Sequence, residues 1–182
     1  KIGRYEVTQQ LWQTVTGSNP SYFGDCMQCP VDSVSWEDIQ RFLKELNQLT
    51  GRQFRLPSEA EWEYACRAGS NDTFCGDDDE AVVAWHNLNS GNRLHPVGAL
   101  EPNLFGLYDM SGNGYEWVQD CWNGSYAAAP NDGSAWESGD CRRRVLRGGA
   151  WYYAPRYAEA SYRNANSSNS RFFIYGFRLA ED

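Results

Sequence analysis

The most informative segment of the chain reads Arg55-Leu56-Pro57-Ser58-Glu59-Ala60-Glu61-Trp62-Glu63-Tyr64-Ala65. Ser58 can cap a helix, Glu61 follows three residues later, and Pro57 lies just ahead of the cap, a combination typical of a helix start. The residues that would face inward are Trp62, Ala65 and Cys66. We therefore expect a helix that begins at Ser58, packs one face on the core and ends at Gly69.

Two further helices are predicted on the N-terminal side of this segment. The first covers residues 9 to about 15 and would end at Gly17. The second begins with Ser35 and Asp38, which resemble a capping box, and would end at Gly51. Apolar residues recur at helical spacing in both, at Leu11, Trp12 and Val15 and at Ile39, Phe42, Leu43, Leu46 and Leu49.

The pattern changes after Gly69 to short segments separated by turn signals such as residues 89–92 and 131–133. Only brief apolar runs lie between these turns, among them residues 82–85 and 145–146. Helices followed by irregular loops and small strands indicate an α+β fold with little regular secondary structure. We find no internal repeat and no change of composition that would divide residues 1–182, so we expect a single domain.

Composition excludes several classes of protein. The net charge of −8 argues against nucleic-acid binding, which needs clustered Lys and Arg. No apolar run approaches the ~20 residues that span a bilayer, so no membrane span is expected in this chain. Aromatic residues make up 15% of the chain, a high share that suits either a loop-rich core or a binding face. Residues 2–7 read as a strand already under way, and we expect that the natural protein has further residues ahead of Lys1.

The six cysteines suit neither a dense disulfide framework nor a strictly reducing compartment. Cys121 and Cys141 flank a polar segment that reads as a surface loop, and they are either bridged or two buried thiols. Cys26 and Cys29 have metal-type spacing, but no second pair stands at zinc distance, which argues against a zinc site.

Several ordered motifs together resemble one family. They are residues 5–8, 30–36, 55–65, 103–113, 147–151 and 176–180. In this order they are similar to the formylglycine-generating enzyme, or sulfatase-modifying factor, domain. The resemblance covers nearly the whole chain and implies a C-type lectin-like fold of that type, lacking only the opening strand.

The catalytic chemistry of that family does not carry over to this chain. The enzymes use two cysteines shortly after a Gly-Gly motif to bind copper, because soft thiolates suit Cu(I). Here no cysteine follows Gly148-Gly149, and the last cysteine is Cys141. The two histidines, His86 and His95, cannot replace the three-histidine iron site of the related sulfoxide synthases. We therefore expect no catalytic residue, no copper and no enzyme activity.

The resemblance also implies a structural calcium site in the loop that leads to Trp117. The matching ligands are the side chains of Asp109 and Glu116 and the backbone carbonyls of Gly112 and Gly114. Oxygen ligands clustered along one short loop suit Ca²⁺. The alternative is an empty loop whose carboxylates cap local backbone, and the sequence leaves both open.

The segment after Gly149 has the composition of a binding surface. Its aromatic residues are Tyr152, Tyr153, Tyr157, Tyr162, Phe172, Phe173 and Tyr175. Between Tyr162 and Phe172 lie Asn164, Asn166, Ser167, Ser168, Asn169 and Ser170, and this mixture of aromatic and small polar residues is found in antibody paratopes. The alternative is that these rings pack the last strands of the fold. A buried strand would instead favour Val, Ile and Leu.

The same segment is similar to the variable regions of proteins diversified by retroelements, in which adenines of Asn codons are replaced at random. Eleven positions hold residues that such changes produce, namely Tyr152, Tyr153, Ala154, Tyr157, Tyr162, Asn164, Asn166, Ser170, Phe172, Phe173 and Ile174. We expect these positions to contact the ligand and residues 147–182 to form the variable binding region.

The sequence therefore predicts a non-catalytic ligand-binding domain of a retroelement-diversified variable protein. Its partner would be a protein or another cell-surface ligand, and its location extracellular or on the surface of a bacterium or phage. Two alternatives remain, an oxidoreductase of the formylglycine-generating type and a structural accessory domain of a longer chain.

Overall fold

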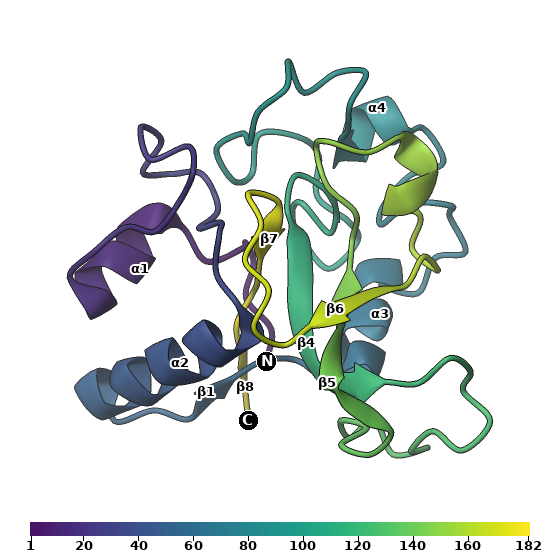
Figure 1. Ribbon diagram of the computed structural model, residues 1–182. Coiled ribbons are helices and arrows are strands. Elements are labelled where there is room, and N and C mark those ends of the chain that lie inside the picture. Colours follow the sequence, from purple (N-terminus) through teal and green to yellow (C-terminus); the bar gives the residue numbers. More distant parts are fainter.

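The computed structural model, which describes residues 1–182, contains a few helices, most of them in the N-terminal half, and several small sheets (Figure 1). The helices are α1 (Gln9–Thr16), α2 (Trp36–Thr50), α3 (Glu59–Arg67), α4 (Glu80–Val83) and the 3-10 helix η1 (Pro155–Ala158). The strands are β1 (Phe54–Arg55), β2 (Ala84–Trp85), β3 (Ser111–Gly112), β4 (Tyr115–Trp122), β5 (Asp140–Arg147), β6 (Asn164–Ser167), β7 (Tyr175–Gly176) and β8 (Ala180–Glu181). The predicted α+β class, with little regular structure, is confirmed.

The three predicted N-terminal helices are present, and their caps are largely the expected ones. Ser35 and Ser58 each form a capping box, with Asp38 and Glu61 respectively. The predicted end of α3 was off by one residue, because Ala68 rather than Gly69 closes the helix, in the left-handed conformation. Leu49 was also wrongly placed on the buried face of α2, since it lies near the end of the helix and is exposed.

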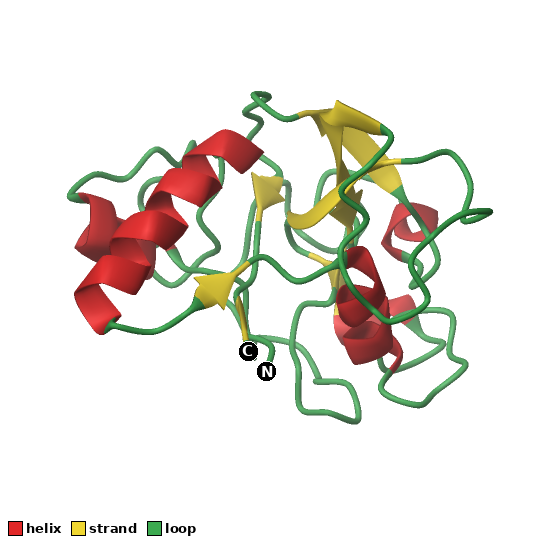
Figure 2. Ribbon diagram, turned by 90° about the horizontal axis from the view of Figure 1, so that it is seen from below, coloured by secondary structure: helices red, strands yellow, loops and turns green.

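The central sheet has the strand order β6-β5-β4-β7. Its longest pairing joins β4 and β5 in antiparallel register, with Trp117 opposite Leu146, while β7 runs parallel to β4. Figure 2 shows the helices on both sides of the sheets. The alternation of buried and exposed residues that normally reveals a strand is absent from β4, where nearly every side chain is buried.

The two ends of the chain lie side by side (Figure 1). The amino group of Lys1 donates a hydrogen bond to the Glu181 carbonyl, and β1 pairs with β8. The strand expected over residues 2–7 is reduced to a single bridge between Ile2 and Ala180, because Arg4 and Val7 turn to other partners.

All six cysteines form disulfides, in the pairs Cys26–Cys29, Cys66–Cys75 and Cys121–Cys141. The bridge across the polar loop is therefore confirmed, and its alternative of two buried thiols is wrong. The other two bridges were not expected. Three disulfides are typical of proteins from an oxidising compartment. No helix combines the length and the apolar character that crossing a membrane would require.

Candidate functional site

The path of the C-terminal segment is set by the Gly148-Gly149 turn at the end of β5. Both residues have positive φ, and a Cβ on Gly149 would lie 2.6 Å from the Tyr157 carbonyl oxygen and 2.7 Å from the Ala158 Cα. Only glycine fits this close approach. The turn directs Trp151 into the core, where its backbone N–H donates to the Asn113 carbonyl.

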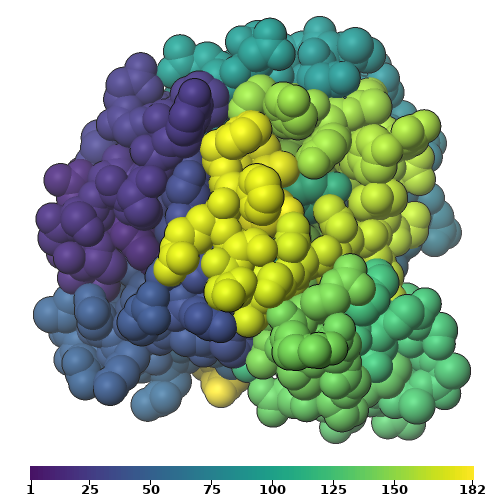
Figure 3. Space-filling view, in the orientation of Figure 1, coloured from purple at the N-terminus to yellow at the C-terminus, as the bar shows by residue number.

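Beyond this turn, five aromatic side chains form a continuous line. We call Phe173, Tyr152, Tyr153, Tyr157 and Tyr162 the ring row. Successive ring centroids in that order are 5.5, 5.5, 5.4 and 5.1 Å apart. Distances in this range give favourable edge-to-face contacts. In the space-filling view the C-terminal residues, in yellow and lime, cover the centre of one face (Figure 3).

The ring row packs on two buried aromatic side chains, Trp151 of the same segment and Tyr115 of β4. Trp151 contacts Tyr152 and Phe173 with ring centroids 5.4 and 5.7 Å away. Tyr153 packs on the buried Tyr115 of β4. Burial, and after it the neighbouring Tyr157, raises the pKa of the Tyr162 hydroxyl above its ordinary value. The row is therefore a neutral, semi-rigid surface with hydroxyl groups at its edge.

Strand β6 extends this surface with polar side chains. Asn166 donates from its amide to the Tyr175 hydroxyl at 2.8 Å, and the Ser170 hydroxyl donates to the Asn166 side-chain oxygen at 3.2 Å. These contacts link the amide-rich strand to the aromatic cluster. Small polar groups beside rings can adapt their hydrogen bonds to different ligands.

The predicted contact residues differ in their exposure. Tyr152 and Phe172 are exposed, with 52% and 48% of their surface accessible. Those of intermediate exposure are Tyr153, Ala154, Tyr157, Tyr162, Asn164, Asn166, Ser170 and Phe173. The placement of Ile174 and Tyr175 on the surface is wrong. Both are buried, because β7 pairs with β4 and both side chains then pack in the hydrophobic core that contains Trp117.

Two arginines, Arg147, which is buried, and Arg163, which is partly buried, hold the segment to the rest of the fold. Arg147 contacts Glu59 at 2.7 Å, Glu63 at 2.8 Å and the Ala160 carbonyl at 2.6 Å. Arg163 forms a paired hydrogen bond with the same Glu59 carboxylate, at 2.6 and 2.7 Å. Paired contacts of this kind fix orientation as well as adding energy. These contacts therefore attach the backbone that carries the ring row to α3.

Two of the residues expected to hold calcium, Asp109 and Glu116, lie close to the second buried arginine, Arg178. Both oxygens of Glu116 are engaged by Arg178, at 2.6 and 2.7 Å, and one of them also accepts from the Trp62 indole at 2.7 Å. Asp109 accepts from the Gly98 N–H through one oxygen, and its other oxygen is buried without a partner. No group of three or more His, Cys, Asp or Glu side chains is arranged to hold a metal ion. The Glu116 carboxylate is thus already paired with the Arg178 guanidinium, and the calcium site, half of whose expected ligands are backbone carbonyls, stays a prediction.

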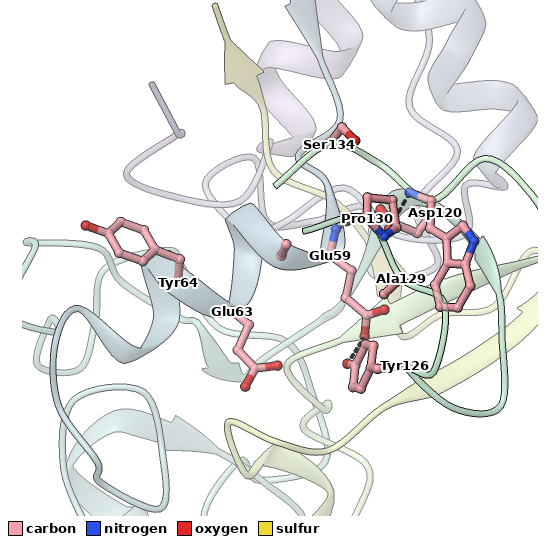
Figure 4. Close-up of a pocket in the computed structure, with 10 residues that line it drawn as sticks. Glu59, Glu63, Tyr64, Asp120, Tyr126, Ala129, Pro130 and Ser134 are labelled. Atoms are coloured by element: carbon pink, nitrogen blue, oxygen red, sulfur yellow. Dashed lines mark hydrogen bonds between the residues drawn. The ribbon is translucent and has the colours of Figure 1, made fainter. Parts of the chain in front are cut away.

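A hollow of about 270 Å³ lies away from the ring row, between α3 and the Cys121–Cys141 loop (Figure 4). Glu59, Glu63 and Asp120 line it together with Tyr126 and Trp136. The carboxylates are already paired, Glu59 and Glu63 with arginines and Asp120 with backbone N–H groups. The hollow therefore shows no free charged group for a ligand.

One exposed aromatic residue beside the ring row was not singled out from the sequence. The Tyr22 ring is 72% exposed, and its centroid lies 5.7 Å from that of Phe173. A signal was available, because Tyr22-Phe23 follows a segment of Gly, Ser, Asn and Pro at residues 17–21, a composition like that of the C-terminal segment.

Comparison with known proteins places this geometry in a family. A chaperone protein, LppX, from Paenibacillus barcinonensis is 31% identical over an alignment covering 98% of this chain and 78% of that protein. The formylglycine-generating enzyme of Streptomyces coelicolor is 33% identical and is matched by 84% of this chain. The match spans only 52% of the length of that enzyme.

Solved structures agree with these sequence matches. Treponema denticola variable protein 1 superposes with a TM-score of 0.92 at 32% identity, covering 99% of this chain and 83% of that one. PvdO from Pseudomonas aeruginosa superposes with a TM-score of 0.89 at 34% identity, covering 100% of this chain and 79% of that one. The sulfatase-modifying factor enzyme 1-like domain matches residues 1–182, and the chain belongs to this family.

Proposed function

We propose that the chain is a non-catalytic ligand-binding domain of a diversified variable protein, with residues 147–182 as its variable binding region. The observation that carries this proposal is the ring row, a neutral aromatic surface with amide and hydroxyl groups at its edge, on a buried ionic scaffold. Such a surface suits a broad protein contact. The similarity to Treponema denticola variable protein 1 supports it.

The disposition of the cysteines supports the non-catalytic part of the proposal. A copper site of the formylglycine-generating type needs free thiolates, and every cysteine of this chain is in a disulfide. None follows Gly149 in the sequence. The contact residues are the exposed and half-buried members of the C-terminal segment, without Ile174.

The disulfides also support a location outside the reducing cytoplasm. We propose display on the surface of a bacterium or phage, where a protein or another cell-surface molecule would be the ligand. Diversification benefits a receptor that encounters many different ligands, and a receptor on the surface of a bacterium or phage is exposed to such ligands.

Deep sequencing of the 3′ end of the gene across a population of the source organism tests the proposal. We expect variation concentrated at the adenine-derived positions between Tyr152 and Phe173, with Trp151, Arg163 and Arg178 unchanged. A uniform C-terminal segment would overturn the proposal of diversification.

A second experiment separates binding from catalysis. The protein is incubated with copper and a cysteine-containing peptide, and the peptide is examined for formylglycine by mass spectrometry. We expect no product. Formation of formylglycine would establish the oxidoreductase alternative instead.

A further inference from the structure

We propose that Tyr22, which lies outside the variable region, is a fixed anchor of the same binding surface. The inference rests on the proposed function and extends it to a residue in the loop between α1 and α2. Tyr22 continues the ring row by one member beyond Phe173, so the line of rings runs from the N-terminal loop across the C-terminal segment. Figure 3 shows dark purple N-terminal residues directly beside the yellow C-terminal ones.

The loop holds Tyr22 in place even though its ring is exposed. The Tyr22 N–H donates to the buried Asp32 carboxylate at 2.8 Å, and the Asp32 N–H donates to the Ser21 hydroxyl at 3.1 Å. The neighbouring Phe23 ring packs edge-on against both Tyr22 and Trp151, at 5.0 and 5.7 Å. Little conformational entropy is therefore lost when the Tyr22 ring becomes buried by a partner.

The loop is also tied to the variable region. The Ser33 N–H donates to the Phe172 carbonyl at 3.0 Å, which fixes the loop at one edge of the ring row. The disulfide Cys26–Cys29 restrains the other side of the loop. Tyr22 therefore keeps its position relative to the backbone of the variable region when the variable side chains change, because the Ser33–Phe172 hydrogen bond joins backbone groups and the disulfide lies outside that region.

The partner that fits this extended row is a folded protein surface with an apolar centre and an acidic edge. The apolar requirement comes from the rings. The acidic requirement comes from Arg156, which is exposed at the end of the ring row opposite Tyr22. Its guanidinium lies 4.8 Å from the centroid of the Tyr157 ring and forms no ion pair with a carboxylate. The other exposed arginine of the region, Arg171, is already paired with Asp38.

The test uses a display library of the full chain, randomised at the proposed contact positions except Ile174 and selected against bovine serum albumin. Tyr22→Ala is then introduced into several independent binders. We expect Kd to rise by about 10-fold or more in most of them, because a rigid aromatic anchor at an interface contributes strongly. Tyr22→Phe should keep most of the affinity.

Tyr64→Ala is the matched control. Tyr64 lies on α3, is 70% exposed and packs on Phe105 rather than on the ring row, so its removal should leave Kd unchanged. Binders whose Kd changes no more with Tyr22→Ala than with Tyr64→Ala would overturn the anchor and leave the proposed function intact. A library that yields no binder at all would overturn the proposed function. Melting temperatures of each variant show that the fold is retained.

Discussion

Residues 152–173 and residues 174–180 belong to one C-terminal segment, yet they serve opposite purposes. The first stretch carries the ring row, whose members are exposed or half-buried. The second places Tyr175, Phe177 and Arg178 in the interior. Both stretches are rich in aromatic residues, so composition does not separate them. Aromatic content therefore indicates that a segment makes packing contacts, but it does not say whether they are made in the core or with a ligand. Whether a ring is buried depends on the strand of the sheet that it joins.

The buried stretch also places one charged side chain, Arg178, in the interior. Arg178 contacts Glu116, the Tyr108 carbonyl and the Gly3 carbonyl, so it connects the C-terminal end to β4 and to the N-terminus. A surface built above such anchors can change its side chains without loss of the fold. Removal of an anchor, by contrast, leaves a charge buried without its partner.

The largest expected effect comes from Arg178→Ala. It leaves Glu116 buried without its guanidinium, and the free energy of unfolding should fall by about 3 to 5 kcal/mol. Urea unfolding measures this loss. Arg156→Ala is the matched control on the exposed stretch and should stay within about 0.5 kcal/mol. Equal losses of unfolding free energy in the two variants would contradict the division into a buried anchoring stretch and an exposed binding stretch.

Tyr175→Ala should cost nearly as much, about 3 to 4 kcal/mol, because it opens a cavity among Tyr115, Trp117 and Phe172. Tyr152→Ala should cost less than about 1 kcal/mol, since half of its ring already faces solvent. Thermal unfolding of the two variants compares them directly. A larger loss for Tyr152 would favour a purely structural accessory domain.

Loss of the Cys121–Cys141 bridge in a double serine variant should lower the free energy of unfolding by about 3 kcal/mol. The bridge spans 20 residues and restricts the unfolded chain more than Cys26–Cys29, which spans 3. The double serine variant of the shorter bridge should cost roughly 2 kcal/mol by the same reasoning. We also expect ligand binding to survive loss of the Cys121–Cys141 bridge but to weaken on loss of the Cys26–Cys29 bridge, which lies in the same loop as Tyr22.

The smallest effect is a dependence on pH at the edge of the variable region. Burial alone would raise the pKa of Asp38, but hydrogen bonds from Arg171 and Ser35 outweigh it and hold that pKa below its usual value. The stabilisation is thus complete at neutral pH and is lost as pH falls below about 4 toward the folded-state pKa. Melting temperatures between pH 7 and pH 2 should fall less steeply in Asp38→Asn than in the unmodified protein. Parallel curves would show that this contact contributes nothing.

The helices could be predicted from the sequence because their signals are local. Ser35 with Asp38 and Ser58 with Glu61 are capping boxes within one turn, and the structure contains both. The strand β4 escaped prediction because Glu116 and Asp120 interrupt its apolar residues. These carboxylates are buried only because Arg178 and the backbone N–H groups of Glu59 and Trp136 satisfy them. The pairing of Glu116 with Arg178 could not be predicted for the same reason, since the two residues are distant in the sequence.

The sequence by itself determined the family, the helix boundaries to within about a residue and the lack of a cysteine after Gly149, because each rests on neighbouring residues or on ordered motifs. Only the tertiary structure decided which rings of the C-terminal segment face solvent, which cysteines pair and that Tyr22 joins the ring row. The exposure of the rings and the position of Tyr22 depend on contacts between residues more than a hundred positions apart, as when the Ser33 N–H donates to the Phe172 carbonyl. Such contacts are set by the packing of the whole core rather than by any local pattern.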